Sequence, residues 1–98
     1  MSGQIKMSPA ELTHKARGYG ESHDIIKEVL AKLEHLQEDL RAQWEGKAFE
    51  SFDNQFRELK PKVENFAVLM QEINEQLNKT ADAMAEQDQA LSQNFGFR

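Results

Sequence analysis

The chain has 98 residues, a length that allows one domain over 1–98. Its 17 acidic residues outnumber 12 basic ones and give a formal net charge of -5, which argues against nucleic acid as a partner because phosphate binding needs clustered Lys and Arg. There is no cysteine, so disulfides, thiol catalysis and cysteine-based metal sites are excluded. The 39% hydrophobic and 30% charged content is typical of amphipathic helices.

The sequence predicts neither a cleavable signal peptide nor a membrane span. Residues Met1 to Met7 hold one lysine and no apolar core, so no cleavable signal peptide is predicted. No stretch approaches the roughly 20 apolar residues of a membrane span. Export would therefore need a route that does not read such a leader.

A first helix is predicted over 8–43. Ser8 and Glu11 have the spacing of a capping box, and Pro9 falls at the first helical position, where its missing N–H costs nothing. Apolar residues then recur at steps of three and four, with a second set that widens the stripe. These residues are Leu12, Ala16, Tyr19, Ile26, Leu30, Leu33 and Leu40, widened by Ile25, Val29 and Leu36. Gly18 and Gly20 are expected to admit a close helix neighbour or a slight bend.

A second helix is predicted over 47–93. Its apolar stripe alternates steps of three and four, a mean period near 3.5 that is typical of a coiled coil. The stripe comprises Phe49, Phe52, Phe56, Leu59, Val63, Phe66, Met70, Ile73, Leu77, Met84 and Leu91. Pro61 removes a helical hydrogen bond, so a kink is expected near it.

Between the two helices only Trp44, Glu45 and Gly46 remain. So short a connection folds the second helix back antiparallel to the first. Gly46 suits the left-handed conformation that ends a helix, and Trp44 is expected to cover the open end of the hairpin against Phe49. The predicted fold class is therefore all-α, an antiparallel two-helix hairpin.

Both apolar stripes are wider than a lone hairpin can cover, which predicts dimerisation into a four-helix bundle. The residues expected in the core or at the dimer contact are Ile26, Leu30, Leu33, Leu40, Phe49, Phe52, Phe56, Phe66, Ile73 and Leu77. The second helix should also overhang the first by roughly 16 Å at 1.5 Å per residue. This C-terminal arm, 84–98, carries Met84, Asp88, Leu91 and Phe95 on one face, and an apolar face without a partner in its own hairpin indicates an interaction site.

No catalytic, cofactor or metal site is predicted. His14, His23 and His35 are nine and twelve residues apart, whereas helical ligand pairs need a spacing of three or four. His14 and His35 are expected to face solvent, and His23 to lie on the helix seam. Two helices without a cleft offer no pocket for a catalytic pair of carboxylates, so the chain is not expected to be an enzyme.

The length, the central Trp44-Glu45-Gly46 and the paired helices resemble the WXG family of small proteins exported by type VII (ESX, or Ess) secretion systems, most closely its EsxA-like branch of Gram-positive bacteria. The family's export signal is usually written Tyr-x-x-x-Asp/Glu. Here Met84-Ala85-Glu86-Gln87-Asp88 keeps the acidic position but has Met in place of Tyr. The broader pattern of the family, hydrophobic-x-x-x-Asp-x-x-hydrophobic-x-x-x-hydrophobic, fits Met84, Asp88, Leu91 and Phe95.

The resemblance implies a secreted, non-enzymatic protein that acts as substrate or co-substrate of the type VII machine, with a role in virulence or host interaction. Its partner would be a second copy or a similar Trp-x-Gly hairpin. Trp44 and Gly46 of one protomer would form, with Met84 and Asp88 of the other, a composite signal read by the export ATPase. The competing interpretation is an intracellular coiled-coil adaptor that is not exported. Disruption of host membranes is a weaker third idea, because the chain lacks a cationic amphipathic face.

Without the resemblance, two of these residues have simpler interpretations. Trp44 would be a core residue that closes the hairpin. Asp88 would be a solvated residue on the surface of its helix.

Overall fold

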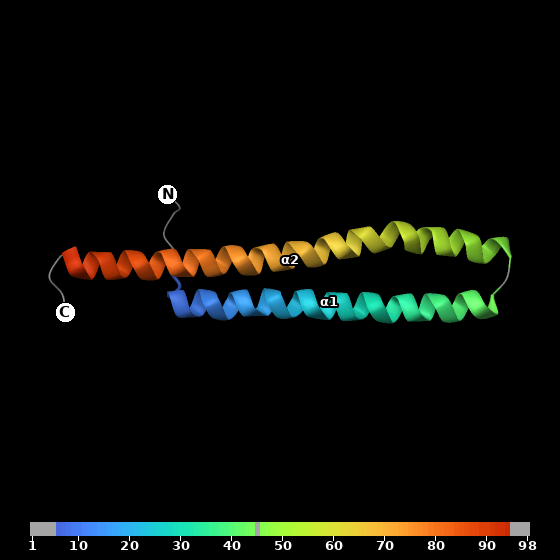
Figure 1. The fold of residues 1–98 in the computed structure, drawn as a ribbon, viewed down its shortest axis with the longest axis horizontal. Helices are drawn as coiled ribbons and strands as arrows, with labels where there is room; N and C mark the ends of the chain where they lie inside the picture. Colours follow the sequence, from blue (N-terminus) through green and yellow to red (C-terminus); the bar gives the residue numbers. More distant parts are fainter. Residues whose placement is uncertain (1–5, 45, 95–98) are drawn as a thin grey trace.

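The structure, a computed structural model, describes residues 6–44 and 46–94, with side chains as far as Gln87. It consists of two long helices, α1 (Pro9–Gln43) and α2 (Lys47–Asn94), and the described residues contain no strand. The helices run antiparallel along a molecule with extents of 76 × 25 × 15 Å (Figure 1). The predicted all-α hairpin is confirmed.

The start of α1 is held by the predicted capping box. The amide of Glu11 donates to Oγ of Ser8 at 3.1 Å, and the amide of Ser8 donates to Oε1 of Glu11 at 3.1 Å. The backbone amide of Ser8 and, less strongly, its hydroxyl favour the ionised carboxylate and lower the pKa of Glu11. α1 therefore begins where local sequence places it.

Removing this cap should cost stability without changing the fold. Ser8→Ala is expected to lower the free energy of unfolding by about 1 kcal/mol, because the Glu11 amide loses its acceptor. Urea unfolding followed by circular dichroism measures the difference. Ser8→Asp is the control and should stay close to wild type, since aspartate is an equally good N-cap. Equal stability of Ser8→Ala and wild type would contradict the role of the cap.

The turn differs in one respect from the expected corner. Trp44 is the C-cap of α1; its backbone is extended, and its N–H donates to the carbonyl of Leu40 at 2.8 Å. Gly46 has the positive φ of 107°, but it lies directly before α2, and its carbonyl accepts from the amide of Glu50 at 3.4 Å. The residue with positive φ therefore initiates the second helix instead of terminating the first. A residue with a side chain would be strained at such a φ, whereas glycine adopts it readily, which explains why glycine occupies this position.

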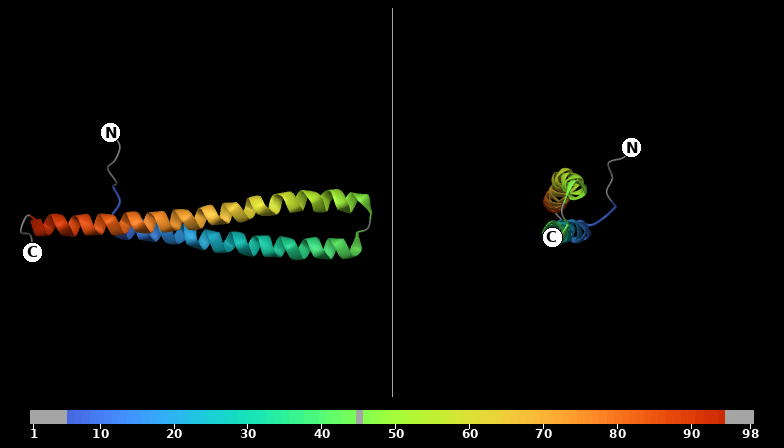
Figure 2. Two further views of the ribbon diagram at one scale, coloured as in Figure 1. Left: turned by 45° about the horizontal axis from the view of Figure 1, so that its top comes forward. Right: turned by 90° about the vertical axis from the view of Figure 1, so that its right-hand side faces the viewer.

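α2 is longer than α1 and continues through Pro61 without a break. Figure 1 shows a gentle bend in the yellow-green segment of α2 that includes this proline. At the same level Nζ of Lys60 lies 2.8 Å from Oε2 of Glu34 on α1. At the other end α2 projects beyond the start of α1, as Figure 1 and the left view of Figure 2 show. The hairpin therefore has the overhang of its second helix that the sequence predicts.

The seam between the helices is narrow and contains small side chains. The buried apolar residues are Leu12, Ala16, Leu30, Phe49, Ala67 and Ala81. Gly20 allows a close approach, because a Cβ placed on it would lie 3.1 Å from Nδ2 of Asn74. A Cβ on Gly18, by contrast, would meet no described atom within 4 Å, so this glycine admits no close neighbour within the hairpin. Gly18 thus faces away from α2.

Candidate functional site

The corner of the hairpin is built from aromatic side chains. The Trp44 ring packs edge-on against Phe49, with centroids 5.8 Å apart, and lies 5.8 Å from the ring of Phe52. The guanidinium of Arg41 lies over the ring of Phe49, 5.6 Å from its centroid, in a cation–π contact. Trp44 nevertheless keeps 40% of its surface exposed. The predicted contact with Phe49 is confirmed, and the ring retains a free surface for a partner.

Directly behind the corner lies a polar cluster around two buried side chains, which the apolar spacing does not reveal. Asp53 is 7% exposed and accepts from Nε2 of Gln37 at 3.1 Å, while Gln37 is itself 5% exposed. The guanidinium of Arg41 lies 2.9 Å from Oδ1 of Asp53, and that of Arg57 lies 3.1 Å from Oδ2. The hydrogen bond from Gln37, followed by the charges of the two arginines, lowers the pKa of Asp53. The cluster ties α1 to α2 beside Trp44.

This cluster predicts acid sensitivity of the corner. Because the pKa of Asp53 is lower in the folded than in the unfolded chain, its contribution to stability is complete above the ordinary aspartate range and is lost as the pH falls through the lowered pKa. In Asp53→Asn the melting temperature should therefore fall less steeply as the pH is lowered into the acid range. The substitution should also lower the melting temperature at neutral pH. An equally steep fall in Asp53→Asn would show that the cluster does not stabilise the hairpin.

One side of the hairpin is apolar and uncovered. Its exposed large side chains, called here the apolar face, are Ile25, Val29, Leu36 and Leu40 of α1 and Phe52, Leu59, Phe66 and Leu69 of α2. Near the corner the face is hollowed into a groove of about 360 Å³. The groove is lined by Leu33, Leu36, Gln37, Leu40, Phe52, Gln55, Phe56 and Leu59. Single exposed apolar residues are ordinary, but a contiguous face of this length indicates a binding surface.

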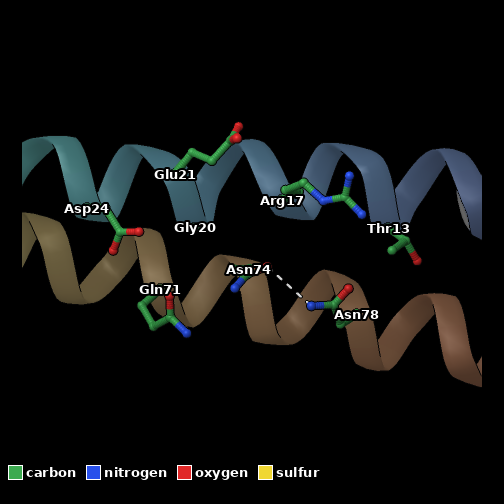
Figure 3. A pocket seen from close by; sticks show the side chains of 8 residues that line it. All are labelled: Thr13, Arg17, Gly20, Glu21, Asp24, Gln71, Asn74 and Asn78. Carbon is green, nitrogen blue, oxygen red and sulfur yellow. Dashed lines mark hydrogen bonds between the residues drawn. The ribbon is translucent and has the colours of Figure 1, made fainter.

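The other side of the hairpin is polar. A groove of about 460 Å³ between the helices is lined by Thr13, Arg17, Gly20, Glu21, Asp24, Gln71, Asn74 and Asn78 (Figure 3). In it Nδ2 of Asn78 donates to Oδ1 of Asn74 at 3.2 Å. A smaller groove beside Asp53 is lined by polar residues and Phe56. The hairpin therefore has one side suited to water and one suited to a partner.

The predicted core and contact residues separate into two groups. Leu30 and Phe49 are buried within the hairpin, and Ile26, Leu33, Phe56, Ile73 and Leu77 are half-buried. Leu40, Phe52 and Phe66 are exposed and belong to the apolar face. A single periodic stripe in the sequence thus supplies both the seam and the outer surface.

The C-terminal arm is described in part. Met84 is half-buried, and the backbone of α2 is helical through Asp88 and Leu91 to Asn94. The side chains of Asp88 and Leu91, and the whole of Phe95, lie outside the described residues. Met84 is far from Trp44 in the same chain, because the corner and the arm lie at opposite ends of the hairpin (Figure 1). One chain alone does not bring the two parts of the expected signal together.

The histidines lie where the sequence predicts. His14 and His35 are exposed, and His23 is half-buried, with Nδ1 3.0 Å from Oδ1 of Asp24. Within the described part of the chain, no three His, Cys, Asp or Glu side chains come together as metal ligands would. Neither helix, over the residues described, combines the length and apolar character of a bilayer span.

Comparison with known proteins identifies the family. Residues 4–89 match the family model WXG100, described as proteins of 100 residues with WXG. The chain belongs to the WXG100 family. The type VII secretion system extracellular protein A of Staphylococcus aureus strain USA300 is 52% identical over 94 residues, which cover 96% of this chain and 97% of the relative. The protein of the same name from strain Newman matches equally well.

Two solved structures share the hairpin. Geobacillus thermodenitrificans EsxA aligns with a TM-score of 0.83 and 35% identity, over 94% of this chain and 99% of that one. EsxB of Bacillus anthracis, described as a secreted protein, aligns with a TM-score of 0.78 over 89% of this chain and 99% of its own. At 23% identity the second likeness concerns the fold alone. The resemblance inferred from Trp44-Glu45-Gly46 is confirmed.

Proposed function

We propose that this WXG100 protein is a non-enzymatic substrate or co-substrate of a type VII secretion system and is exported as a dimer. The observation that carries the proposal is the match over nearly the full length to proteins named as type VII extracellular proteins. The match includes the Trp-x-Gly corner and both helices. The apolar face and the exposed Trp44 supply the two surfaces that such a role requires.

The dimer is supported by the apolar face. Burying an aliphatic or aromatic side chain contributes about 1.5–3 kcal/mol, so leaving eight such side chains in water is unfavourable. Packing the face against the same face of a second hairpin completes a four-helix bundle, and the polar groove stays on the outside. A second copy or a similar Trp-x-Gly hairpin would provide this surface.

The composite export signal is supported by the distance between its two parts in a single chain, because only a second chain can bring them together. Trp44 and Gly46 lie at one end of the hairpin, and Met84 and Asp88 at the other. In an antiparallel dimer the C-terminal arm of each chain, with Leu91 and Phe95, would lie beside the corner of its partner. The export ATPase of the secretion machine would then bind residues of both chains.

Export is tested by comparing a strain that has the type VII ATPase with a strain that lacks it. The chain should appear in the medium only in the first strain, while a cytoplasmic marker enzyme stays in the cells of both. Retention of the chain in the cells of both strains would contradict the proposal and favour an intracellular adaptor. Release that is independent of the ATPase would also contradict it.

A further inference from the structure

Arg41 makes two contacts at once beside the corner. Nη2 of its guanidinium lies 2.9 Å from Oδ1 of Asp53, and the guanidinium carbon lies 5.6 Å from the centroid of Phe49. Phe49 and Asp53 are four residues apart on α2, so they lie one above the other on the same face of that helix. One side chain of α1 therefore joins the buried carboxylate to the aromatic corner.

The carboxylate end of this link is fixed from several sides. Nε2 of Gln37 donates to Oδ1 of Asp53 at 3.1 Å, and the guanidinium of Arg57 lies 3.1 Å from Oδ2. Gln37 and Asp53 are both buried, so the packing around them restricts their side chains. Asp53 can thus hold the guanidinium of Arg41 in one place.

Phe49 is the buried ring of the corner. It is 7% exposed, whereas Trp44 is 40% exposed and Phe52 39%. The Trp44 ring packs edge-on against Phe49 at an interplanar angle of 63°. Trp44 itself caps α1 with an extended backbone, so packing within a helix does not hold its side chain. The orientation of the Trp44 ring therefore depends on the rings of Phe49 and Phe52.

The middle of this link suits arginine better than lysine. A guanidinium is planar, so its edge can donate to a carboxylate while its face lies on an aromatic ring. The ammonium group of a lysine is a compact point charge and cannot occupy both places at once. The residue type at position 41 therefore matches the double contact that the structure shows.

Resting on the proposed recognition of the corner by the export ATPase, we infer that Arg41 is a positioning residue for Trp44. Asp53 holds the guanidinium, the guanidinium holds Phe49, and Phe49 holds the Trp44 ring in the orientation that the ATPase binds. A ring that is fixed before binding loses less conformational freedom when it binds. Releasing one such side chain lowers the affinity roughly two- to tenfold.

Fluorescence tests whether Arg41 fixes the ring, because Trp44 is the single tryptophan of the chain. Arg41→Lys keeps the charge and can keep the ion pair with Asp53. Time-resolved anisotropy of this full-length variant should show a larger fast, nanosecond component than wild type, while circular dichroism stays unchanged. Arg57→Lys is the matched control and should match wild type. Arg57 pairs with the other oxygen of Asp53 but lies eight residues, about 12 Å along α2, from Phe49.

Phe49→Leu tests the path from Arg41 to Trp44. This substitution keeps an apolar side chain at the buried position but removes the ring, so the fast component should again increase. Adding Arg41→Lys to Phe49→Leu should give no further increase, because Arg41 acts on Trp44 through the same ring. Additive increases would overturn the path through Phe49.

Export measurements separate this inference from the proposed function. At equal cellular amounts, Arg41→Lys should reach the medium roughly two- to tenfold more slowly than wild type, and Arg57→Lys at the wild-type rate. Unchanged anisotropy in Arg41→Lys would overturn the inference and leave the proposed function standing. A loosened ring with export at the wild-type rate would do the same. Release of the wild type that is independent of the ATPase would overturn both.

Discussion

Replacing Trp44 by alanine is expected to abolish export while the chain stays helical. The ring contacts Phe49 and Phe52 on one side and is 40% exposed on the other, so its loss removes surface from the proposed binding site for the ATPase. Truncating an aromatic anchor at an interface costs about 2 kcal/mol or more, roughly a thirtyfold loss of affinity. Immunoblots of cells and medium measure the exported fraction.

Two controls separate recognition from folding in this experiment. Circular dichroism of the purified Trp44→Ala protein should show wild-type helicity, because the hydrogen bonds of the buried Asp53 with Gln37 and Arg41 still join the helices. Trp44→Phe keeps an aromatic ring at the corner and should retain part of the export. If folded Trp44→Ala reaches the medium as well as wild type, the corner has no role in the signal.

Introducing a charge at Phe66 is expected to break the dimer. In Phe66→Glu the proposed interface loses an aromatic side chain from each chain and gains a carboxylate from each chain. Loss of apolar burial alone, about 1.5–3 kcal/mol per chain, raises the dissociation constant by roughly a hundredfold or more. Analytical ultracentrifugation at micromolar concentration should show a monomer, and export should fall with dimerisation.

Val68→Glu is the matched control for this charge. Val68 and Phe66 are each 51% exposed in the single hairpin, so the two substitutions place a carboxylate on equally open surface of the same helix. Val68 lies on the opposite side of α2, and its variant should remain dimeric and exported. Dissociation caused by both variants, or by Val68→Glu alone, would place the interface elsewhere.

The parts of the fold that depend on local interactions are predictable from the sequence. The Ser8 and Glu11 hydrogen bonds join residues three apart, so their spacing alone indicates the start of α1. The contact between Trp44 and Phe49 follows because a connection of three residues leaves the two rings side by side. The antiparallel hairpin is a consequence of the same short connection.

The sequence does not predict which apolar residues of the stripe are buried in the seam between the helices and which are exposed on the apolar face. Residues three or four positions apart all satisfy the spacing of one stripe, yet Phe49 is buried and Phe52, three residues later, is exposed. Small residues form part of the buried seam, and two of them, Ala67 and Ala81, carry little signal in an apolar pattern. Asp53 was missed because a carboxylate is expected in water. The sole available signal was its four-residue spacing from Arg57, which many exposed pairs share.

The composite signal is tested most directly by expressing two defective chains together. A Trp44→Ala chain and an Asp88→Ala chain, each retained in the cell when expressed alone, should both reach the medium when co-expressed. Their antiparallel dimer keeps one end at which an intact corner of one chain lies beside an intact arm of the other. Retention of both chains, despite formation of the mixed dimer inside the cell, would contradict a signal shared between protomers.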